Sequence, residues 1–224
     1  NMVDNKPASL QDRIEAFLRN NRVILAILTT LVIVAIVAVV VGISISRNSQ
    51  QREAARLYEI ETAFSDWQAE IDPENPADPS AIIETLQSER FRAGGYAYHR
   101  QLFLIANAYE IAGNYADAAE QYALAGDSRG FLGTTALLKS GLMLEAAGDL
   151  EAARAALTGL VEDFDTAEEP RVKFTLGRLS EALEKYEAAR QWYDRVIADH
   201  SASGWADFAQ NRLIALVVDG LISE

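Results

Sequence analysis

Three segments of this 224-residue chain repeat one pattern at intervals of 35 and 36 residues. The pattern has a small residue, an alanine twelve positions later and a Tyr or Leu sixteen positions later. These positions are Ala106, Ala118 and Tyr122; Gly141, Ala153 and Leu157; and Gly177, Ala189 and Tyr193. From Tyr96 onward the chain reads as helices of about 12–16 residues, with no useful strand-like alternation. One helix pair cannot bury its own apolar side, so we predict an all-α fold of stacked helix pairs.

Each repeated position has a physical reason. The small residue and the alanine suit the point where two helices cross, and the Tyr or Leu fills the space beside them. Gly113 and Gly148 suit a left-handed turn between the helices. Asn114 and Asp149 then suit the cap of the second helix. In the third copy Glu184 replaces the glycine, so we predict a looser turn there.

Over residues 96–201 the pattern resembles the tetratricopeptide repeat family, whose signature is W-x₂-L-G-x₂-Y…A-x₃-F at about 34 residues. The first copy reads Ile105-Ala106-x₂-Tyr109…Ala118-x₃-Tyr122. The resemblance implies a tetratricopeptide-repeat α-solenoid, a curved array whose concave face is lined by the first helix of each pair.

The resemblance also implies which side chains line that concave face. They are Arg100, Phe103, Asn107 and Glu110; Thr135, Leu138, Leu142 and Glu145; and Arg171, Phe174, Arg178 and Glu181. This mixture of apolar and charged groups suits an extended or loosely folded polypeptide, and it lacks the Lys/Asn/Arg carboxylate clamp of chaperone-tail binders. Packing between repeats is the other interpretation for Phe103, Leu138, Leu142 and Phe174.

A run of 23 residues, 23–45, contains no charged side chain. About 20 such residues span a bilayer as a helix, whereas the apolar part of a secretory signal has about 7–15 residues. We therefore predict an uncleaved transmembrane helix. Four Lys or Arg residues precede the run and three follow it closely, so the positive-inside rule narrowly favours a cytoplasmic N-terminus.

Charge and composition exclude several functions. The formal net charge is −13; residues 1–46 carry +1, so the remainder carries −14. Such an acidic domain repels phosphate backbones, and we expect no nucleic-acid partner. The absence of cysteine excludes disulfides, thiolate metal sites and a cysteine nucleophile.

No catalytic or cofactor-binding pattern is present. The two histidines, His99 at a helix start and His200 in a loop, lie about 100 residues apart and fit no metal-binding spacing. The acidic run at residues 162–170 reads as a solvated loop. We therefore expect no enzymatic activity, no cofactor and no metal.

The whole layout resembles the bacterial inner-membrane family of ancillary Sec-translocon subunits. The segments RIEAFLRNNRVILA and GGYAYHRQLFLIANAY carry the likeness. It implies a periplasmic repeat domain that associates with translocon subunits, a membrane-anchored periplasmic chaperone and unfolded secretory clients. One alternative is a scaffold of an envelope machine, such as a flagellar motor collar or a division complex. A cytosolic adaptor, which requires the opposite topology, is the other.

The predicted organisation has five parts. They are a cytoplasmic amphipathic segment (1–22), the transmembrane helix (23–45), connecting helices with a degenerate first pair (46–95), three repeats (96–203) and a C-terminal capping helix (204–224).

Overall fold

The computed structural model describes residues 17–18, 21–72, 78–163 and 168–223, and these residues form helices and connecting turns without a strand. The helices are α2 (Arg22–Ala69), α3 (Ser80–Ser88), α4 (Tyr96–Ile111), α5 (Tyr115–Ala125), α6 (Phe131–Ala146), α7 (Leu150–Asp163), α8 (Glu169–Ala182), α9 (Tyr186–Asp199) and α10 (Gly204–Val218). The amphipathic segment predicted within residues 1–22 lies almost entirely outside the described residues.

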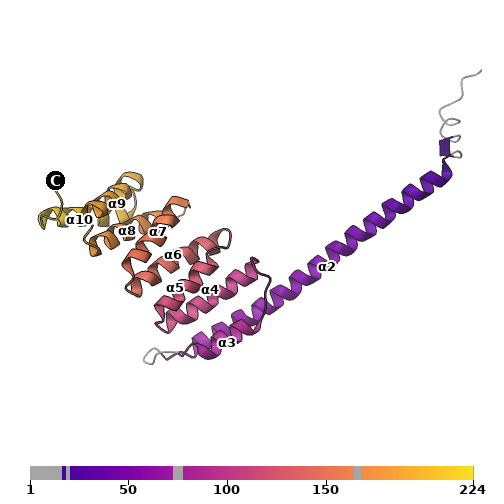
Figure 1. Cartoon of the computed structure of the whole chain (residues 1–224), viewed down its shortest axis with the longest axis horizontal. Coiled ribbons are helices and arrows are strands. Elements are labelled where there is room, and N and C mark those ends of the chain that lie inside the picture. Colours follow the sequence, from indigo (N-terminus) through magenta and orange to yellow (C-terminus); the bar gives the residue numbers. More distant parts are fainter. Residues whose placement is uncertain (1–16, 19–20, 73–77, 164–167, 224) are drawn as a thin grey trace, which may run out of the picture. The chain divides into compact units, whose positions relative to one another are not determined.

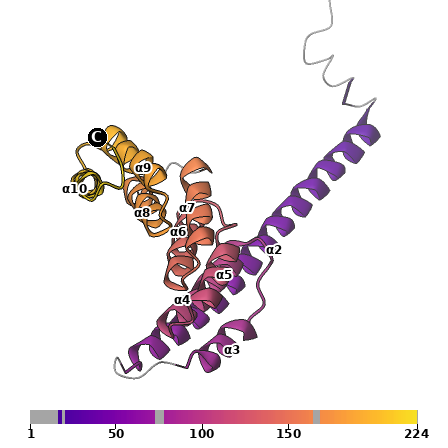
Figure 2. The same ribbon diagram turned by 60° about the vertical axis from the view of Figure 1, so that its left-hand side comes forward.

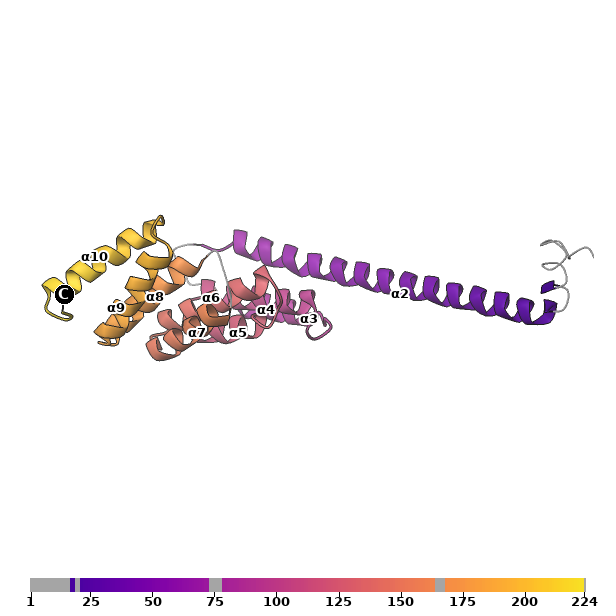
Figure 3. The same cartoon turned by 90° about the horizontal axis from the view of Figure 1, so that it is seen from above.

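The chain divides into two compact units, Asn1–Glu53 and Ala54–Glu224, and α2 contains residues of both. Figure 3 shows α2 as a helix without a break. Its most apolar 18-residue stretch has a mean hydropathy of 3.3, and none of that stretch is buried. By length and composition, α2 is the one helix of the described chain that is able to cross a membrane. Because α2 extends to Ala69, the first of the connecting helices predicted within residues 46–95 is a continuation of this same helix.

In the second unit, the helices from α4 to α10 form a row in which each packs against the next one along the chain (Figure 1). Helices α4 and α5, α6 and α7, and α8 and α9 are joined by three-residue turns at 112–114, 147–149 and 183–185. Helix α10 contacts both α8 and α9 (Figure 2). This part of the described chain therefore consists of three successive helical hairpins followed by a single helix.

Within each hairpin, the two helices meet where the repeated small residues lie. Ala118, Ala153 and Ala189 have no exposed surface. A Cβ atom on Gly141 would lie 2.4 Å from Leu157 Cδ2, and one on Gly177 would lie 2.4 Å from Tyr193 Cε1. These distances confirm that the small residue makes room for the large side chain of the second helix.

The turns inside the hairpins share one backbone geometry. Gly113 and Gly148 have φ of +75° and +87°, as predicted. Glu184 has φ of +58°, and its amide donates to the Glu181 carbonyl at 2.8 Å, as the Gly113 amide does to Glu110 at 3.1 Å. The prediction of a looser third turn is therefore wrong. Packing of α8 against α9 holds Glu184 in the same left-handed turn conformation, although Glu184 has a Cβ atom.

Of the two predicted N-terminal helix caps, one is present and the other is not. Asp149 Oδ1 accepts a hydrogen bond from the Ala152 amide at 3.1 Å and caps α7, as predicted. Asn114 makes no side-chain cap bond at the start of α5, so that prediction is wrong. In the closing helix Leu216 is buried, whereas Leu221 lies beyond the end of α10 and is 40% exposed. The turn at Gly220 buries the next residue, Ile222, in its place.

Candidate protein-binding groove

A ladder of ion pairs runs across the first helices of the hairpins. Glu110 Oε2 lies 2.7 Å from Lys139 Nζ of α6, and Glu145 Oε1 lies 2.5 Å from Arg178 Nη1 of α8. Arg100 of α4 pairs with Glu61 of α2 at 2.7 Å in the same manner. The first two pairs join successive hairpins, and the third joins the first hairpin to α2.

The last rung of the ladder joins α8 to α10. The Glu181 carboxylate there accepts hydrogen bonds from the Arg212 guanidinium and from the Tyr193 hydroxyl. Arg178, Glu145 and Glu181, which were predicted to contact a partner, form ion pairs within this chain.

Two buried tyrosines extend the ladder. The Tyr122 hydroxyl donates to Glu110 and lies 2.6 Å from Asn107 Oδ1, while Lys139 Nζ lies 3.1 Å from the same hydroxyl. Burial raises the pKa of Tyr122 well above its usual range, and the adjacent Glu110 carboxylate raises it further. Burial and Glu181 act in the same way on the pKa of Tyr193. Both phenols therefore remain neutral hydrogen-bond donors inside the fold.

One groove of about 620 Å³ opens along α6. Its walls are formed by Glu110, Gly130, Phe131, Thr134, Thr135, Leu138, Lys139, Leu142, Met143, Leu160, Glu168 and Arg171, and we call it the α6 groove. Phe131 stands at the start of α6 with 87% of its surface exposed. The spacing of Phe131, Leu138 and Leu142 places these side chains along one side of the helix.

The α6 groove brings together part of the predicted partner-binding set. Glu110, Thr135, Leu138, Leu142 and Arg171 line it, and they come from three different hairpins. The other seven predicted residues lie outside it. They are Arg100, Phe103, Asn107, Glu145, Phe174, Arg178 and Glu181.

The two predicted aromatic contacts are engaged in packing. Phe103 is buried, and its ring lies edge-on to Tyr122 with centroids 5.2 Å apart. Phe174 is half-buried, and its ring centroid lies 5.5 Å from that of Tyr193 and 5.4 Å from that of Trp205. Phe103 thus packs inside the first hairpin, and Phe174 packs inside the third hairpin and against α10.

Seven groove residues were not identified from the sequence: Gly130, Phe131, Thr134, Lys139, Met143, Leu160 and Glu168. Lys139 lies 29 residues from its partner Glu110, and Leu160 belongs to a second helix. Only the packing of the hairpins brings these residues to the groove. Phe131 follows a Gly-containing turn and begins an apolar helix, and this position was the local sequence signal for an exposed aromatic side chain.

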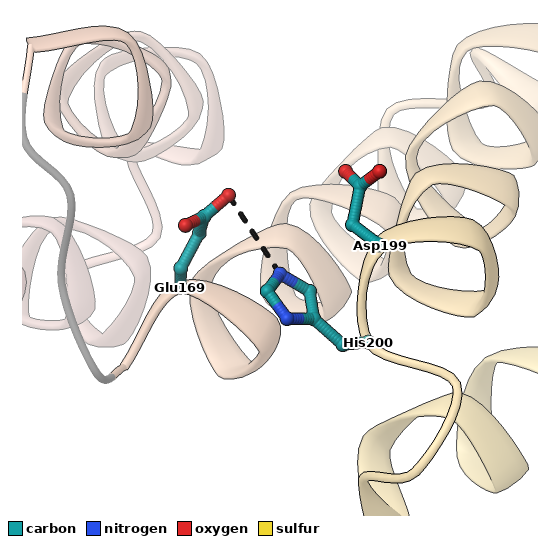
Figure 4. Close-up of side chains that lie close together, drawn as sticks. All are labelled: Glu169, Asp199 and His200. Carbon is teal, nitrogen blue, oxygen red and sulfur yellow. Dashed lines mark ion pairs between the residues drawn. The ribbon is translucent and has the colours of Figure 1, made fainter.

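Glu169, Asp199 and His200 form the one group in the described part of the chain with donor atoms close enough for a metal ion (Figure 4). His200 Nε2 lies 3.7 Å from Glu169 Oε1. The buried Lys173 ammonium already occupies this position, 2.6 Å from Glu169 Oε1 and 2.5 Å from Asp199 Oδ2. A metal ion would have to displace Lys173, so we assign the cluster a structural role at the contact of α8 with α9.

No family model, no curated protein and no solved structure matches this chain. The tetratricopeptide and translocon-subunit resemblances therefore stay predictions. What the geometry provides is a row of helical hairpins with an apolar groove and one helix apolar enough to span a membrane.

Proposed function

We propose that this chain is a membrane-anchored protein of the tetratricopeptide-repeat type that binds segments of partner proteins in the α6 groove. The observation that carries the proposal is the exposure of Phe131 beside an apolar wall formed by Leu138, Leu142 and Leu160. A large aromatic side chain left in water at the edge of a concave site is typical of a protein-binding surface.

Support for the repeat class comes from the regularity of the hairpins. The same small-to-large contact recurs at Gly141 with Leu157 and at Gly177 with Tyr193. The left-handed turn recurs at residues 113, 148 and 184. A solenoid of this type displays a long surface for polypeptide binding while its core stays fully packed.

The charges of the groove favour an apolar ligand. Its two cations are already paired, Lys139 with Glu110 at 2.7 Å and Arg171 with Glu168 at 3.5 Å. A carboxylate or phosphate group would have to compete with these internal pairs. The groove therefore suits apolar side chains of an extended or unfolded segment, held with a few polar contacts at the rim.

The apolar part of α2 supports a membrane anchor, and the flanking Lys and Arg residues favour a cytoplasmic N-terminus with a periplasmic repeat domain. In that position the groove would meet secreted polypeptides soon after translocation. We therefore propose an ancillary translocon role, with translocon subunits, a membrane-anchored periplasmic chaperone and unfolded secretory clients as partners.

Binding in the groove is tested with the full chain in lipid nanodiscs and a permanently unfolded, fluorescently labelled polypeptide as the probe. Phe131→Ser removes an exposed aromatic group, and Thr135→Lys places a charge in the groove. We expect each variant to bind the probe about tenfold more weakly, which corresponds to about 1.4 kcal/mol. Tyr58→Ser, at an aromatic side chain on α2 that is 70% exposed, is the matched control and should leave the affinity unchanged. Equal affinity of wild type and both groove variants would rule out the groove as the binding site.

The translocon role is tested separately by crosslinking the full chain in cells and identifying what co-purifies. Translocon subunits together with a periplasmic chaperone support the proposal. Recovery of flagellar or division components in their place would replace it with the envelope-scaffold function.

A further inference from the structure

Helix α10 ends the row of helices, and only one of its sides is covered by the described chain. Ala206, Ala209 and Leu216 are buried against the preceding hairpin. Arg212 forms the last rung of the ion-pair ladder with Glu181. These contacts fix the position of α10 on the hairpin of α8 and α9.

The opposite side of α10 is apolar and exposed. Phe208 and Ile214 are each 56% exposed, and Val218 is 78% exposed. Asp207, Asn211, Ile214 and Val218 recur at spacings of three and four residues that place them on one side of the helix, and Phe208 lies at the edge of that side. We call this surface the α10 face. The Phe208 ring packs against the rings of Trp205 and Phe174, whose centroids lie 5.8 Å and 6.2 Å from its own.

A carboxylate lies at each end of the α10 face. Asp207 stands in the first turn of α10, and Asp219 follows its last residue. Neither carboxylate has an ion pair or a side-chain hydrogen bond within the described chain. Twelve residues of helix separate the two, or about 18 Å at 1.5 Å per residue. The one basic side chain of α10, Arg212, is committed to Glu181.

This charge pattern decides between possible occupants. If a second copy packed its α10 antiparallel on this face, Asp207 of one chain would oppose Asp219 of the other. A parallel pair would oppose identical carboxylates. Both arrangements are disfavoured by like-charge repulsion. Anionic lipid headgroups are repelled for the same reason.

We propose that the α10 face is a second protein-docking surface, and that its partner is an amphipathic helix with an apolar side flanked by two Lys or Arg residues about twelve positions apart. The apolar centre would cover Ile214 and Val218, and the two cations would reach Asp207 and Asp219. A helix suits this surface because the exposed side of α10 is itself helical, and two helices pack with the ridges of one in the grooves of the other. This docking surface is distinct from the α6 groove in position and in ligand.

The test uses the full chain in zwitterionic nanodiscs and two synthetic helical peptides of 18 residues. Both peptides carry the same Leu/Ala apolar side; one has Lys at positions 3 and 15, and the other has Glu there. We expect the Lys peptide to bind at least about fivefold more tightly than the Glu peptide, as two exposed charge pairs allow. The chain with Asp207→Asn and Asp219→Asn should reduce this preference to about twofold or less.

A second pair of variants tests whether the peptide binds at the α10 face. Ile214→Glu with Val218→Glu changes two exposed side chains and should weaken binding of the Lys peptide about tenfold. Tyr58→Ser on α2, at an exposed aromatic outside both proposed surfaces, should leave it unchanged. The proposal is overturned by equal binding of both peptides, by absence of binding, or by an equal loss of binding in Tyr58→Ser. It is also overturned if the wild type is a dimer that the Ile214→Glu/Val218→Glu chain no longer forms.

Discussion

At the scale of single residues, the hairpin turns show how packing overrides local preference. Glycine occupies the left-handed position in the first two hairpins, and Glu184 occupies it in the third with φ of +58°. A residue with a Cβ atom is disfavoured in this region by about 1–2 kcal/mol. The contacts between α8 and α9 therefore hold Glu184 in a conformation that it would not adopt alone.

Glu184→Gly is expected to stabilise the repeat domain by about 1 kcal/mol, because glycine adopts this conformation without strain. The free energy of unfolding by urea, followed by circular dichroism, measures the effect. Glu184→Ala is the control, since it removes the exposed carboxylate and keeps the strain. A gain of the same size in Glu184→Ala would show that charge, and not backbone strain, is responsible.

The small residues at the helix crossings give a second prediction. Gly177→Ala is expected to destabilise the domain by about 2 kcal/mol, because the added methyl group would lie 2.4 Å from the buried Tyr193 ring. Gly159→Ala in α7 meets nothing within 4 Å and should instead stabilise by about 0.5–1 kcal/mol. Thermal unfolding of the two variants in parallel measures the contrast. Equal effects of the two changes would contradict the close helix crossing.

At the scale of the helices, side-chain ties connect elements that are distant along the chain. The Lys173 ammonium links the first turns of α8 to the end of α9 through Glu169 and Asp199. Burial opposes its charge, yet the hydrogen bonds that the ammonium donates to Asp199 and Glu169 raise the pKa of Lys173 overall. The same hydrogen bond holds the pKa of Asp199 below its usual value of 3.8.

The lowered pKa of Asp199 predicts a pH dependence. A carboxylate whose pKa is depressed by folding contributes stability above its unfolded pKa, and this contribution disappears as the pH falls through the folded value. Asp199→Asn should therefore lower the melting temperature at pH 7 and have a smaller effect below about pH 3. Asp117→Asn on α5, which makes no contact with Lys173, is the matched control. A loss in Asp199→Asn that is the same at both pH values would show that the ion pair does not contribute.

At the scale of the whole molecule, the chain joins a helix suited to lipid with an acidic helical domain. None of the residues in the most hydrophobic 18-residue stretch of α2 is buried. In water such a helix would expose a large hydrocarbon surface. Insertion into a bilayer removes this cost and satisfies the backbone hydrogen bonds within the helix.

Membrane insertion is therefore expected to be sensitive to charge at the centre of residues 23–45. Val34→Arg with Val37→Arg adds roughly 3 kcal/mol per arginine to the insertion free energy and should move the chain out of the alkali-resistant membrane fraction. Ser49→Arg with Gln51→Arg adds the same charges outside the apolar run and should leave the chain in the membrane. Retention of the Val34→Arg/Val37→Arg chain would contradict a transmembrane α2.

The sequence by itself determined the features that depend on near neighbours. The period of the small residues predicted the hairpins, the glycines predicted two turns, and the charge-free run predicted the apolar helix. These signals are local, because helix periodicity and turn geometry depend on residues within one or two turns of each other.

Tertiary structure decided which side chains are exposed and available for binding. It buried Phe103, left Phe131 exposed and paired Glu110 with Lys139 across 29 residues. It also closed the turn at Glu184 and left one side of α10 uncovered. These outcomes depend on how the hairpins stack, because burial and ion pairing arise between residues that no periodic pattern connects.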